Sequence, residues 1–176
     1  MTEEATFALD LDALNAMDRE AFTAALGRTF ENAPWVAEAA WAAQPFASLD
    51  ALHAAMMDAV RSAPRGTQLA FLCGHPELAG KEAEVGAMTR ESIGEQASAG
   101  LNALSPGEMG ELRALNARYR ERHGFPFIIA VRRHSKADIF KLLRSRLAQG
   151  SELELNEALA QIACITRMRV EARVAA

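Results

Sequence analysis

The sequence predicts an all-α protein, a single compact domain built from several helices. Alanine and leucine are frequent, β-branched residues are sparse outside residues 128–131, and patterns that start helices recur along the chain. The length of 176 residues is typical of one domain, and no internal repeat or linker divides the sequence. We therefore expect residues 1–176 to fold as one helical domain.

Three helices are expected in the first third of the chain. Asp18 and Ser48 are favourable N-cap residues, and Pro34 suits the first turn of a helix. The third helix should stop near Pro64. Apolar residues follow each start at helical spacing: Phe22, Leu26 and Phe30 in the first helix, Trp35 and Trp41 in the second, and Leu52, Met56 and Val60 in the third.

Three later helices are expected where a serine is followed, three residues on, by a carboxylate. In such a capping box the serine hydroxyl and the carboxylate each accept a hydrogen bond from the other residue's amide. The first of these helices should end at Gly124 and the second near Gly150, because glycine is common just after a helix. The pairs are Ser105 with Glu108, Ser135 with Asp138, and Ser151 with Glu154.

Two stretches do not fit helical patterns. Residues 73–86 hold three glycines and a proline, so they should form an irregular loop. Residues 125–131 are a continuous apolar run, and its periodicity does not separate a short strand from buried extended chain or a helix. Both stretches are places where backbone amides could face a ligand.

The composition argues against several partners and locations. Nineteen Lys and Arg against 23 Asp and Glu leave a net charge of −4, so no broad basic face is available for nucleic acid. No apolar run approaches the ~18 residues that a membrane span needs. Residues 1–4 are acidic where an export signal would be basic, and Cys73 and Cys164 form no Cys-x-x-Cys pair. We expect a cytoplasmic protein whose partner is a small molecule, without nucleic acid or membrane.

Neither a metal nor a nucleotide is expected. The four histidines are scattered, and no His-Glu-x-x-His motif occurs. Glycine-rich phosphate loops and the Gly-x-Ser-x-Gly elbow of serine hydrolases are also absent. The histidines are His53, His75, His123 and His134.

His75 is the first candidate site residue. It precedes Pro76 in the glycine-bounded loop, and proline restricts the residue before it to extended conformations. The side chain is therefore held in a defined pose at the end of an element, where catalytic groups often lie. It is either a catalytic group or a loop histidine bonded to a backbone carbonyl.

The run Ser92-Ile93-Gly94-Glu95-Gln96 is the second candidate. Ser92 and Glu95 have the spacing of a capping box, and spacing alone favours that structural role. Gly94 in the first turn would cost ~1 kcal/mol relative to alanine. It would also let a ligand approach the N-terminus of the helix, where amides favour negative charge.

Arg169 lies near the end of the last expected helix. It is either a surface cation that stabilises the helix C-terminus or a guanidinium fork that holds a carboxylate or ureido group. Its position favours the first interpretation.

Together these motifs resemble the 2-oxo-4-hydroxy-4-carboxy-5-ureidoimidazoline (OHCU) decarboxylase family of urate degradation. Their order and spacing extend from about residue 12 to residue 172. The chain departs from the family at three places. The family often has Phe where this chain has His123, and it commonly has Gly after the apolar run, where this chain has Arg132-Arg133-His134. It usually has Asn-Asp-Arg-like residues near Gln149-Gly150-Ser151. The matching motifs are Glu31–Glu38, His75–Gly80, Ser92-x-x-Glu95-Gln96 with Ala99-Gly100-Leu101, Asn116-x-x-Tyr119, Gly124–Val131 and Arg169.

The resemblance implies an all-helical homodimer that converts OHCU to (S)-allantoin and carbon dioxide without a cofactor. His75 would be the general acid/base, and Glu95 would hold the imidazole or a substrate N–H in place. Arg169 would bind the anionic or ureido end of the substrate. Ring and ureido groups of the substrate would be bound by Ser92, Gln96 and the amides of residues 92–96, which include Ile93 and Gly94. The pocket would be closed by Pro76 and by the backbone of Phe127, Ile128, Ile129, Ala130 and Val131.

Two alternatives remain open. In the first, the chain would be a helical interaction module that docks a partner through Met56-Met57 and aromatic residues. In the second, it would be a related decarboxylase that acts on another ureido acid. The first leaves the His75 and Ser92 motifs unexplained, since methionines at helical spacing are more often part of a core.

Overall fold

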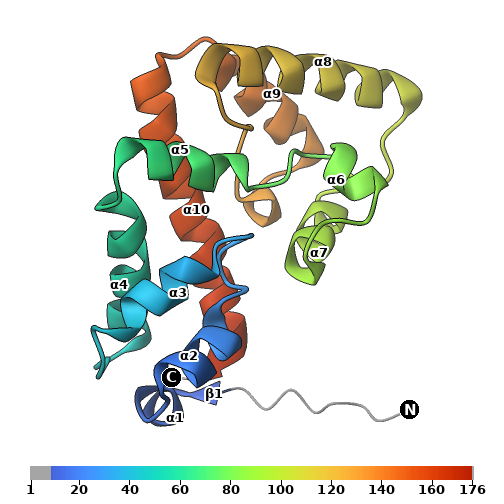
Figure 1. Ribbon diagram of the computed structural model, residues 1–176. Helices are drawn as coiled ribbons and strands as arrows, with labels where there is room; N and C mark the ends of the chain where they lie inside the picture. The colour runs from blue at the N-terminus through green and yellow to red at the C-terminus, as the bar shows by residue number, and fades with distance from the viewer. Residues whose placement is uncertain (1–8, 176) are drawn as a thin grey trace, which may run out of the picture. The chain divides into compact units, whose positions relative to one another are not determined.

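The computed structural model describes residues 9–175, except the side chains of Glu82 and Glu84, so the acidic residues 1–4 lie outside it (Figure 1). Apart from one pair of two-residue strands, all regular secondary structure in the described chain is helical, which confirms the all-α prediction. It forms two compact units: unit 1 holds the chain up to Ala63 together with Thr166–Ala176, and unit 2 holds Pro64–Ile165. One domain over residues 1–176 stays a prediction.

Unit 1 contains short helices and a two-residue parallel strand pair. In the pair, Leu9 is in register with Val174. Helix α3 packs against both α2 and α4. The elements are β1 (Leu9–Asp10), α1 (Leu11–Asn15), α2 (Arg19–Leu26), α3 (Pro34–Trp41), α4 (Leu49–Arg61), the end of α10 (Ser151–Arg173) and β2 (Val174–Ala175).

The helix starts expected in unit 1 are confirmed. Asp18 Oδ1 accepts a hydrogen bond from the amide of Ala21 at 2.8 Å, and Ser48 Oγ accepts one from Ala51 at 3.1 Å. Pro34 is the first residue of α3. Helix α2 ends at Leu26, before Phe30, because Gly27 favours a turn there, yet Phe30 is still buried.

The positions of two methionines on α4 test the hypothesis that the chain is an interaction module. Met56 and Met57 are fully buried in the core, with 0% and 1% of their surface exposed. The hypothesis that Met56-Met57 docks a partner protein is therefore wrong.

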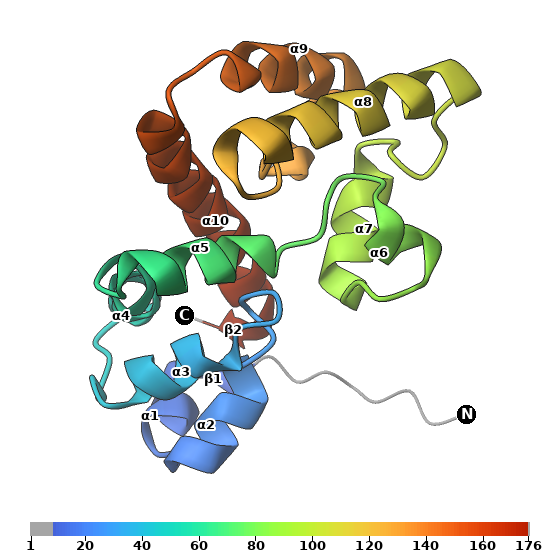
Figure 2. The same ribbon diagram turned by 45° about the horizontal axis from the view of Figure 1, so that its top comes forward.

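Unit 2 contains the remaining helices. Helix α8 packs against α9, and α7 packs against the 3₁₀ turn η1. Figure 2 shows α8 and α9 side by side, with α6 and α7 adjacent to each other. The elements are α5 (Arg65–Cys73), α6 (Lys81–Glu84), α7 (Arg90–Ser98), α8 (Pro106–His123), η1 (Val131–Arg133), α9 (Lys136–Leu147) and the first part of α10.

The capping box at Ser105 is confirmed. The Glu108 amide donates to Ser105 Oγ at 3.2 Å, and the Ser105 amide donates to Glu108 Oε2 at 2.8 Å. The same helix ends at Gly124, which has a left-handed φ of 81°. At the start of α9, Ser135 Oγ accepts from the Asp138 amide at 3.2 Å.

The predicted capping box at Ser151 is wrong. Helix α10 begins at Ser151 itself, and the Glu154 amide donates to the Gly150 carbonyl. The Glu154 carboxylate is completely buried and pairs with Arg146 instead. The capping pattern predicted that the Glu154 carboxylate would bond the helix N-terminus, but it bonds the buried guanidinium of Arg146.

Both irregular stretches are largely as expected. Cys73 is the last residue of α5, and residues 74–86 contain only the single turn of α6. Residues 125–130 have no regular secondary structure and are all buried before the chain enters η1. Within residues 9–175, no helix combines the length and the apolar character needed to cross a membrane.

Candidate active site

The loop that carries His75 begins directly after α5. The His75 amide donates to the Leu72 carbonyl at 3.1 Å, the side chain is half-buried, and Pro76 is buried. Four residues on, Ala79 has a φ of 46°, in the left-handed region that a residue other than glycine rarely adopts. Such a conformation persists only where the surrounding structure holds it.

Helix α7 holds this loop through Gln96. Gln96 Oε1 accepts a hydrogen bond from the Ala79 amide at 2.9 Å, and Nε2 donates to the Glu77 carbonyl at 3.4 Å. Because Ser92 and Glu95 lie on the same helix, Gln96 brings the His75 loop and the Ser92–Gln96 motif into one place.

Helix α8 holds the same loop from another direction. Asn116 Nδ2 donates to the Leu78 carbonyl at 3.1 Å, and Arg120 Nε pairs with Glu77 Oε1 at 2.8 Å. The Leu78 carbonyl and the Ala79 amide, two neighbouring backbone groups, are thus both bonded to side chains. This accounts for the left-handed backbone at Ala79.

The capping box expected at Ser92 and Glu95 is wrong. Thr89 is the N-cap of α7: its hydroxyl accepts from the Ser92 amide at 3.3 Å, and its carbonyl accepts from the Ile93 amide at 3.0 Å. These amides are therefore not available to a ligand, contrary to expectation. Instead, the buried residues of α7 are Ser92, Glu95 and Gln96, which share one face at i, i+3 and i+4.

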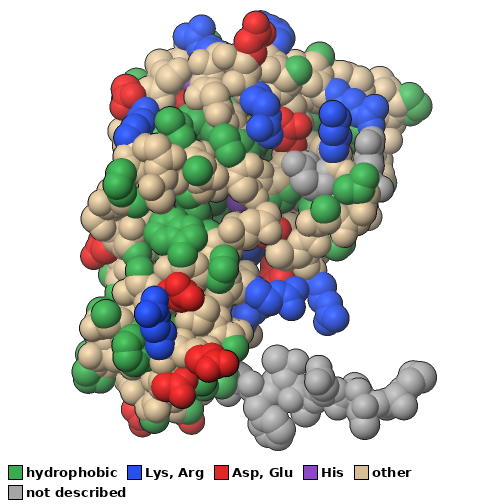
Figure 3. All heavy atoms as spheres, in the orientation of Figure 1, with side chains coloured by type: hydrophobic (Ala, Val, Ile, Leu, Met, Phe, Trp, Pro, Cys, Tyr) green, Lys and Arg blue, Asp and Glu red, His purple; other side chains and the backbone are tan. Residues whose placement is uncertain are grey.

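Gly94 lies in the second turn of α7 and is exposed. A Cβ added to it would lie 3.8 Å from Arg132 Nη2, so the arginine of η1 reaches over this turn. Ile93, beside it, is 48% exposed. Figure 3 shows Lys and Arg side chains gathered where Figure 1 draws α7 and η1. The exposed arginines of these two elements are Arg90, Arg132 and Arg133, which we call the α7–η1 basic patch.

Two side chains hold the 125–131 segment. Arg146 Nη1 donates to the Ile128 carbonyl at 2.8 Å, and Gln161 Oε1 accepts from the Ala130 amide at 2.9 Å. The sequence analysis identified neither residue. A signal existed for Arg146, because it follows Ile139 and Leu143 at helical spacing on the apolar face of α9.

Arg169 is described within unit 1. Its Nη1 lies 3.2 Å from Glu31 Oε2 and 3.2 Å from the Thr29 carbonyl, and the side chain is almost fully buried. Arg169 is therefore not a surface cation. The first and last motifs of the chain meet in this ion pair. Asn32, next to Glu31, has a left-handed φ of 53°, which asparagine tolerates better than most residues.

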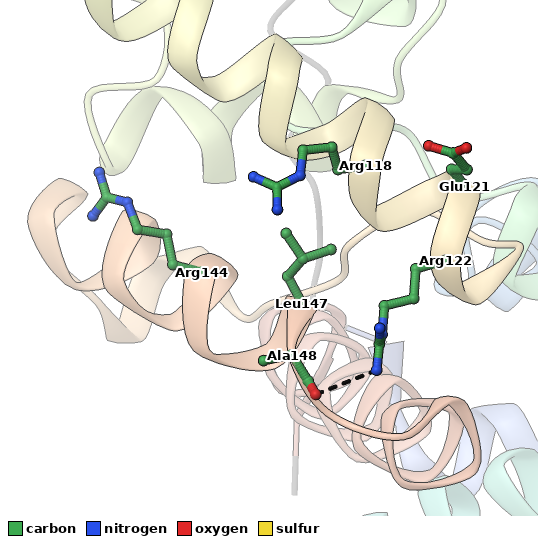
Figure 4. Close-up of a pocket in the computed structure, with 6 residues that line it drawn as sticks. All are labelled: Arg118, Glu121, Arg122, Arg144, Leu147 and Ala148. Carbon is green, nitrogen blue, oxygen red and sulfur yellow. Dashed lines mark hydrogen bonds between the residues drawn. The ribbon is translucent and has the colours of Figure 1, made fainter.

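An arginine-lined pocket of about 500 Å³ lies between α8 and α9 (Figure 4). Arg122 Nη2 donates to the Ala148 carbonyl at 3.4 Å, and Arg144 is paired with Glu111. These contacts tie α8 to α9, so two of the three cations already have structural partners. The lining residues are Arg118, Glu121, Arg122, Arg144, Leu147 and Ala148.

His53 and His123 are bonded to hydroxyl groups of the fold and have lowered pKa values. Burial, followed by the nearby Arg167, lowers the pKa of His53, whose Nε2 lies 2.9 Å from Thr166 Oγ1. Burial also lowers the pKa of His123, whose Nδ1 lies 2.9 Å from Ser151 Oγ. Within the described residues, His, Cys, Asp and Glu form no group of three that could hold a metal ion.

Comparison with known proteins identifies the family. The OHCU decarboxylase family matches residues 15–171. The chain belongs to the OHCU decarboxylase family. A relative from Halalkalicoccus jeotgali, named 2-oxo-4-hydroxy-4-carboxy-5-ureidoimidazoline decarboxylase, is 40% identical over 163 residues, 93% of this chain and 90% of the relative. A relative of the same name from Amia calva is 36% identical over 163 residues, 93% of each chain.

Solved structures agree with this family membership. A crystal structure of (S)-allantoin synthase matches with a TM-score of 0.75 and 26% identity, over 94% of this chain and 54% of that chain. This chain thus spans about half the length of the synthase. A crystal structure of OHCU decarboxylase in the presence of (S)-allantoin matches with a TM-score of 0.65 and 20% identity, over 89% of this chain and 97% of that chain. The second likeness supports the fold.

Proposed function

We propose that this protein decarboxylates OHCU to (S)-allantoin and carbon dioxide in urate degradation. The observation that carries the proposal is the hydrogen bond from the Ala79 amide to Gln96 Oε1. It joins the His75 loop to the helix face of Ser92 and Glu95. The turn η1, which begins at the last residue of the 125–131 segment, packs on the same helix. Three of the motifs that resemble the family therefore converge in unit 2, and the decarboxylase relatives support the substrate.

The substrate's own chemistry makes a cofactor unnecessary. When the bond to the carboxylate carbon breaks, carbon dioxide leaves and the electron pair forms a C=C bond to the ring carbon that carries the ureido group. The π pair of the C=N bond moves onto its nitrogen, which takes a proton. The resulting enol must then take a proton at the carbon that carries the ureido group. The protein has to position the ring, stabilise the developing charge and deliver that proton to one face.

His75 is the proposed general acid/base. Histidine is the side chain that most often serves as a general acid or base in catalysis at neutral pH. Pro76 is buried next to it, and Gln96, Asn116 and Arg120 fix the following residues of the loop. A proton donor held in this way can protonate one face of the enol, which the (S) configuration requires.

Glu95 is proposed to orient the imidazole or a substrate N–H from the buried face of α7. On the same helix, Ser92 and Gln96 would bind ring or ureido groups. The side-chain amide of Gln96 also bonds the backbone of Ala79 and Glu77. Pro76 and the backbone of residues 127–131 would form the pocket wall. From the family resemblance we also propose that Arg169 binds the anionic or ureido end of the substrate.

We also propose that the protein acts as a cytoplasmic homodimer without a cofactor. The family resemblance supports the homodimer and the absence of a cofactor. The location is supported by the two cysteines, which form no Cys-x-x-Cys pair and are both free, as suits a reducing compartment. Light scattering on the purified protein measures the mass of the assembly. A monomer at the concentrations used for activity would contradict the dimer.

Adding purified protein to freshly made OHCU tests the function. Ultraviolet absorbance follows the loss of OHCU, and circular dichroism measures the chirality of allantoin. We expect OHCU to decay faster than in buffer, with the (S) product in excess. Racemic allantoin formed at the background rate would contradict the proposal.

A further inference from the structure

A buried ion pair contacts the 125–131 segment in unit 2. Arg146 Nε donates to both carboxylate oxygens of Glu154 at 3.1 Å, and Nη2 lies 3.0 Å from Oε2. The remaining nitrogen, Nη1, donates to the Ile128 carbonyl at 2.8 Å. The guanidinium carbon lies 4.6 Å from the centroid of the Phe127 ring. One arginine therefore contacts two consecutive residues of the segment.

Tyr119 extends this cluster from α8. Its hydroxyl donates to Glu154 Oε2, and its ring meets the rings of Phe127 and Phe125 edge-on, with centroids 5.4 Å and 6.0 Å apart. Burial, followed by the hydrogen bond to Glu154, raises the pKa of Tyr119 above its ordinary value. The phenol therefore stays protonated and remains a donor to Glu154.

Gln161 holds the segment at a second point. Its Oε1 accepts from the Ala130 amide at 2.9 Å, and its Nε2 donates to Glu157 Oε1 at 2.7 Å, which fixes the amide group. Glu154 and Gln161 are seven residues apart, so they lie on one face of α10. The backbone is thus bonded at Ile128 and at Ala130, on either side of Ile129.

Ile129 itself is 3% exposed, yet its N–H and C=O make no hydrogen bond to any residue between 9 and 175. Buried backbone groups are nearly always bonded, so such groups suit a ligand that bonds them. A buried ion pair is also weak evidence for stability, because apolar residues of similar volume often replace one without loss. The cluster therefore calls for an explanation other than stability.

We infer that Arg146, supported by Glu154 and Tyr119, is a positioning residue that holds the 127–131 backbone in the conformation that binds substrate. This inference rests on the proposed function. None of the three side chains touches the reacting atoms. They act by raising the fraction of molecules whose pocket wall is already formed, and apparent affinity scales with that fraction.

Arg146→Lys tests the inference, with Arg144→Lys as the matched control. Lysine keeps the charge but cannot bond Glu154 and the Ile128 carbonyl with a planar fork. Arg144 lies on the same helix, is exposed and pairs with Glu111, away from the segment. Four quantities are measured: kcat for OHCU, KM for OHCU, amide hydrogen exchange of the peptide covering residues 125–133, and the midpoint of thermal unfolding.

We expect Arg146→Lys to exchange faster in residues 127–131 and to raise KM about tenfold, with kcat within about threefold of the parent protein. Arg144→Lys should leave both KM and exchange unchanged. If Arg146→Lys does not fold, Tyr119→Phe serves, because it removes only the hydroxyl bond to Glu154. Its expected KM increase is about threefold.

Unchanged KM and unchanged exchange in the folded variants would overturn the inference. A fall in kcat alone, with KM constant, would overturn it as well, because positioning of the wall acts on binding. If the parent protein does not turn over OHCU, the proposed function fails instead. The exchange measurement still reports whether Arg146 holds the segment in that case.

Discussion

Gln96 Oε1 accepts a hydrogen bond from the Ala79 amide at 2.9 Å, and this bond fastens the His75 loop to helix α7. Ala79 is left-handed, so its backbone needs partners that hold it in place. Gln96 was expected to bind substrate, and the structure shows that part of its amide group has a structural task. A substitution here should therefore affect both stability and activity.

Gln96→Met keeps the side-chain length but removes the acceptor for the Ala79 amide. A buried amide without a partner costs about 1–3 kcal/mol, so we expect a loss of this size in the free energy of unfolding, measured with urea. Activity at saturating OHCU should fall as well, because the loop no longer holds His75 in one pose. Gln149→Met, at an exposed position, is the control. A variant as stable and as active as the parent would contradict the role of Gln96.

His75→Ala removes the proposed acid/base. We expect a loss of ~10²- to 10⁴-fold in rate, the usual effect of removing a positioned acid or base, while the circular dichroism spectrum stays that of the parent. His134→Ala, at the end of η1, serves as the control histidine. If His75→Ala turned over OHCU at the parental rate, His75 would have no part in the mechanism.

Glu95→Gln separates the charge of the carboxylate from its shape. Glu95 is buried on α7, and glutamine has nearly the same volume, so the helix should form and the unfolding midpoint should change little. Activity should fall by at least about tenfold, because a neutral amide orients an imidazole or a substrate N–H less strongly than a carboxylate. Glu121→Gln, exposed on α8, is the control. Full activity in Glu95→Gln would remove the carboxylate from the site.

Capping patterns predicted helix starts well only where no other side chain, near or distant in sequence, competes. At Ser105 both partners are local, and the reciprocal bonds form as expected. At Ser151 the same pattern fails, since Arg146 takes the Glu154 carboxylate. At Ser92 a threonine three residues earlier caps the helix instead. Local sequence shows which bonds are available to a side chain, but the rest of the fold decides which of them form.

In the candidate site, too, some residues could be predicted from local sequence and others could not. His75, Ser92 and Glu95 were identified because they belong to motifs with fixed spacing. The helical spacing of Arg146 indicates a buried side chain but not its partner. The partners of Arg146 and Gln161 are backbone groups of residues 127–131, and backbone groups leave no residue pattern in a sequence. Side chains that hold a backbone can only be recognised once the two segments are seen together.

We expect Arg132 to raise the rate at which the anionic substrate encounters the site. It belongs to the α7–η1 basic patch and reaches over Gly94, while OHCU carries a carboxylate. Charge near a site raises the rate of encounter, and salt screens this effect. Arg132→Gln should therefore lower kcat/KM several-fold at low ionic strength, and the difference should shrink near 0.15 M salt, where the screening length is about 8 Å. Arg118→Gln, at the arginine-lined pocket, is the control. A loss that does not depend on salt would contradict this role.

Two buried histidines should make the stability depend on pH. Burial lowers the pKa of His53 and of His123 below ~6.5, the ordinary value in an unfolded chain. Between the lowered and the ordinary pKa the unfolded chain binds more protons than the folded one, so acid favours unfolding there. The free energy of unfolding should therefore fall as the pH drops below about 6.5, by at most ~1.4 kcal/mol per pH unit for each histidine.

His123→Phe isolates the share of one of these histidines. Phenylalanine can keep the ring contact with Tyr119, whose centroid lies 4.5 Å from that of His123, but it has no proton to gain. Urea unfolding of the parent and the variant between about pH 5 and pH 7.5 should give curves that separate as the pH falls, with the variant losing less stability. The hydrogen bond between His123 and Ser151 is lost at every pH, so its loss shifts the whole curve without changing the slope. Parallel curves over this range would show that His123 is protonated equally in the folded and unfolded chains, which its burial beside Tyr119 and Phe125 argues against.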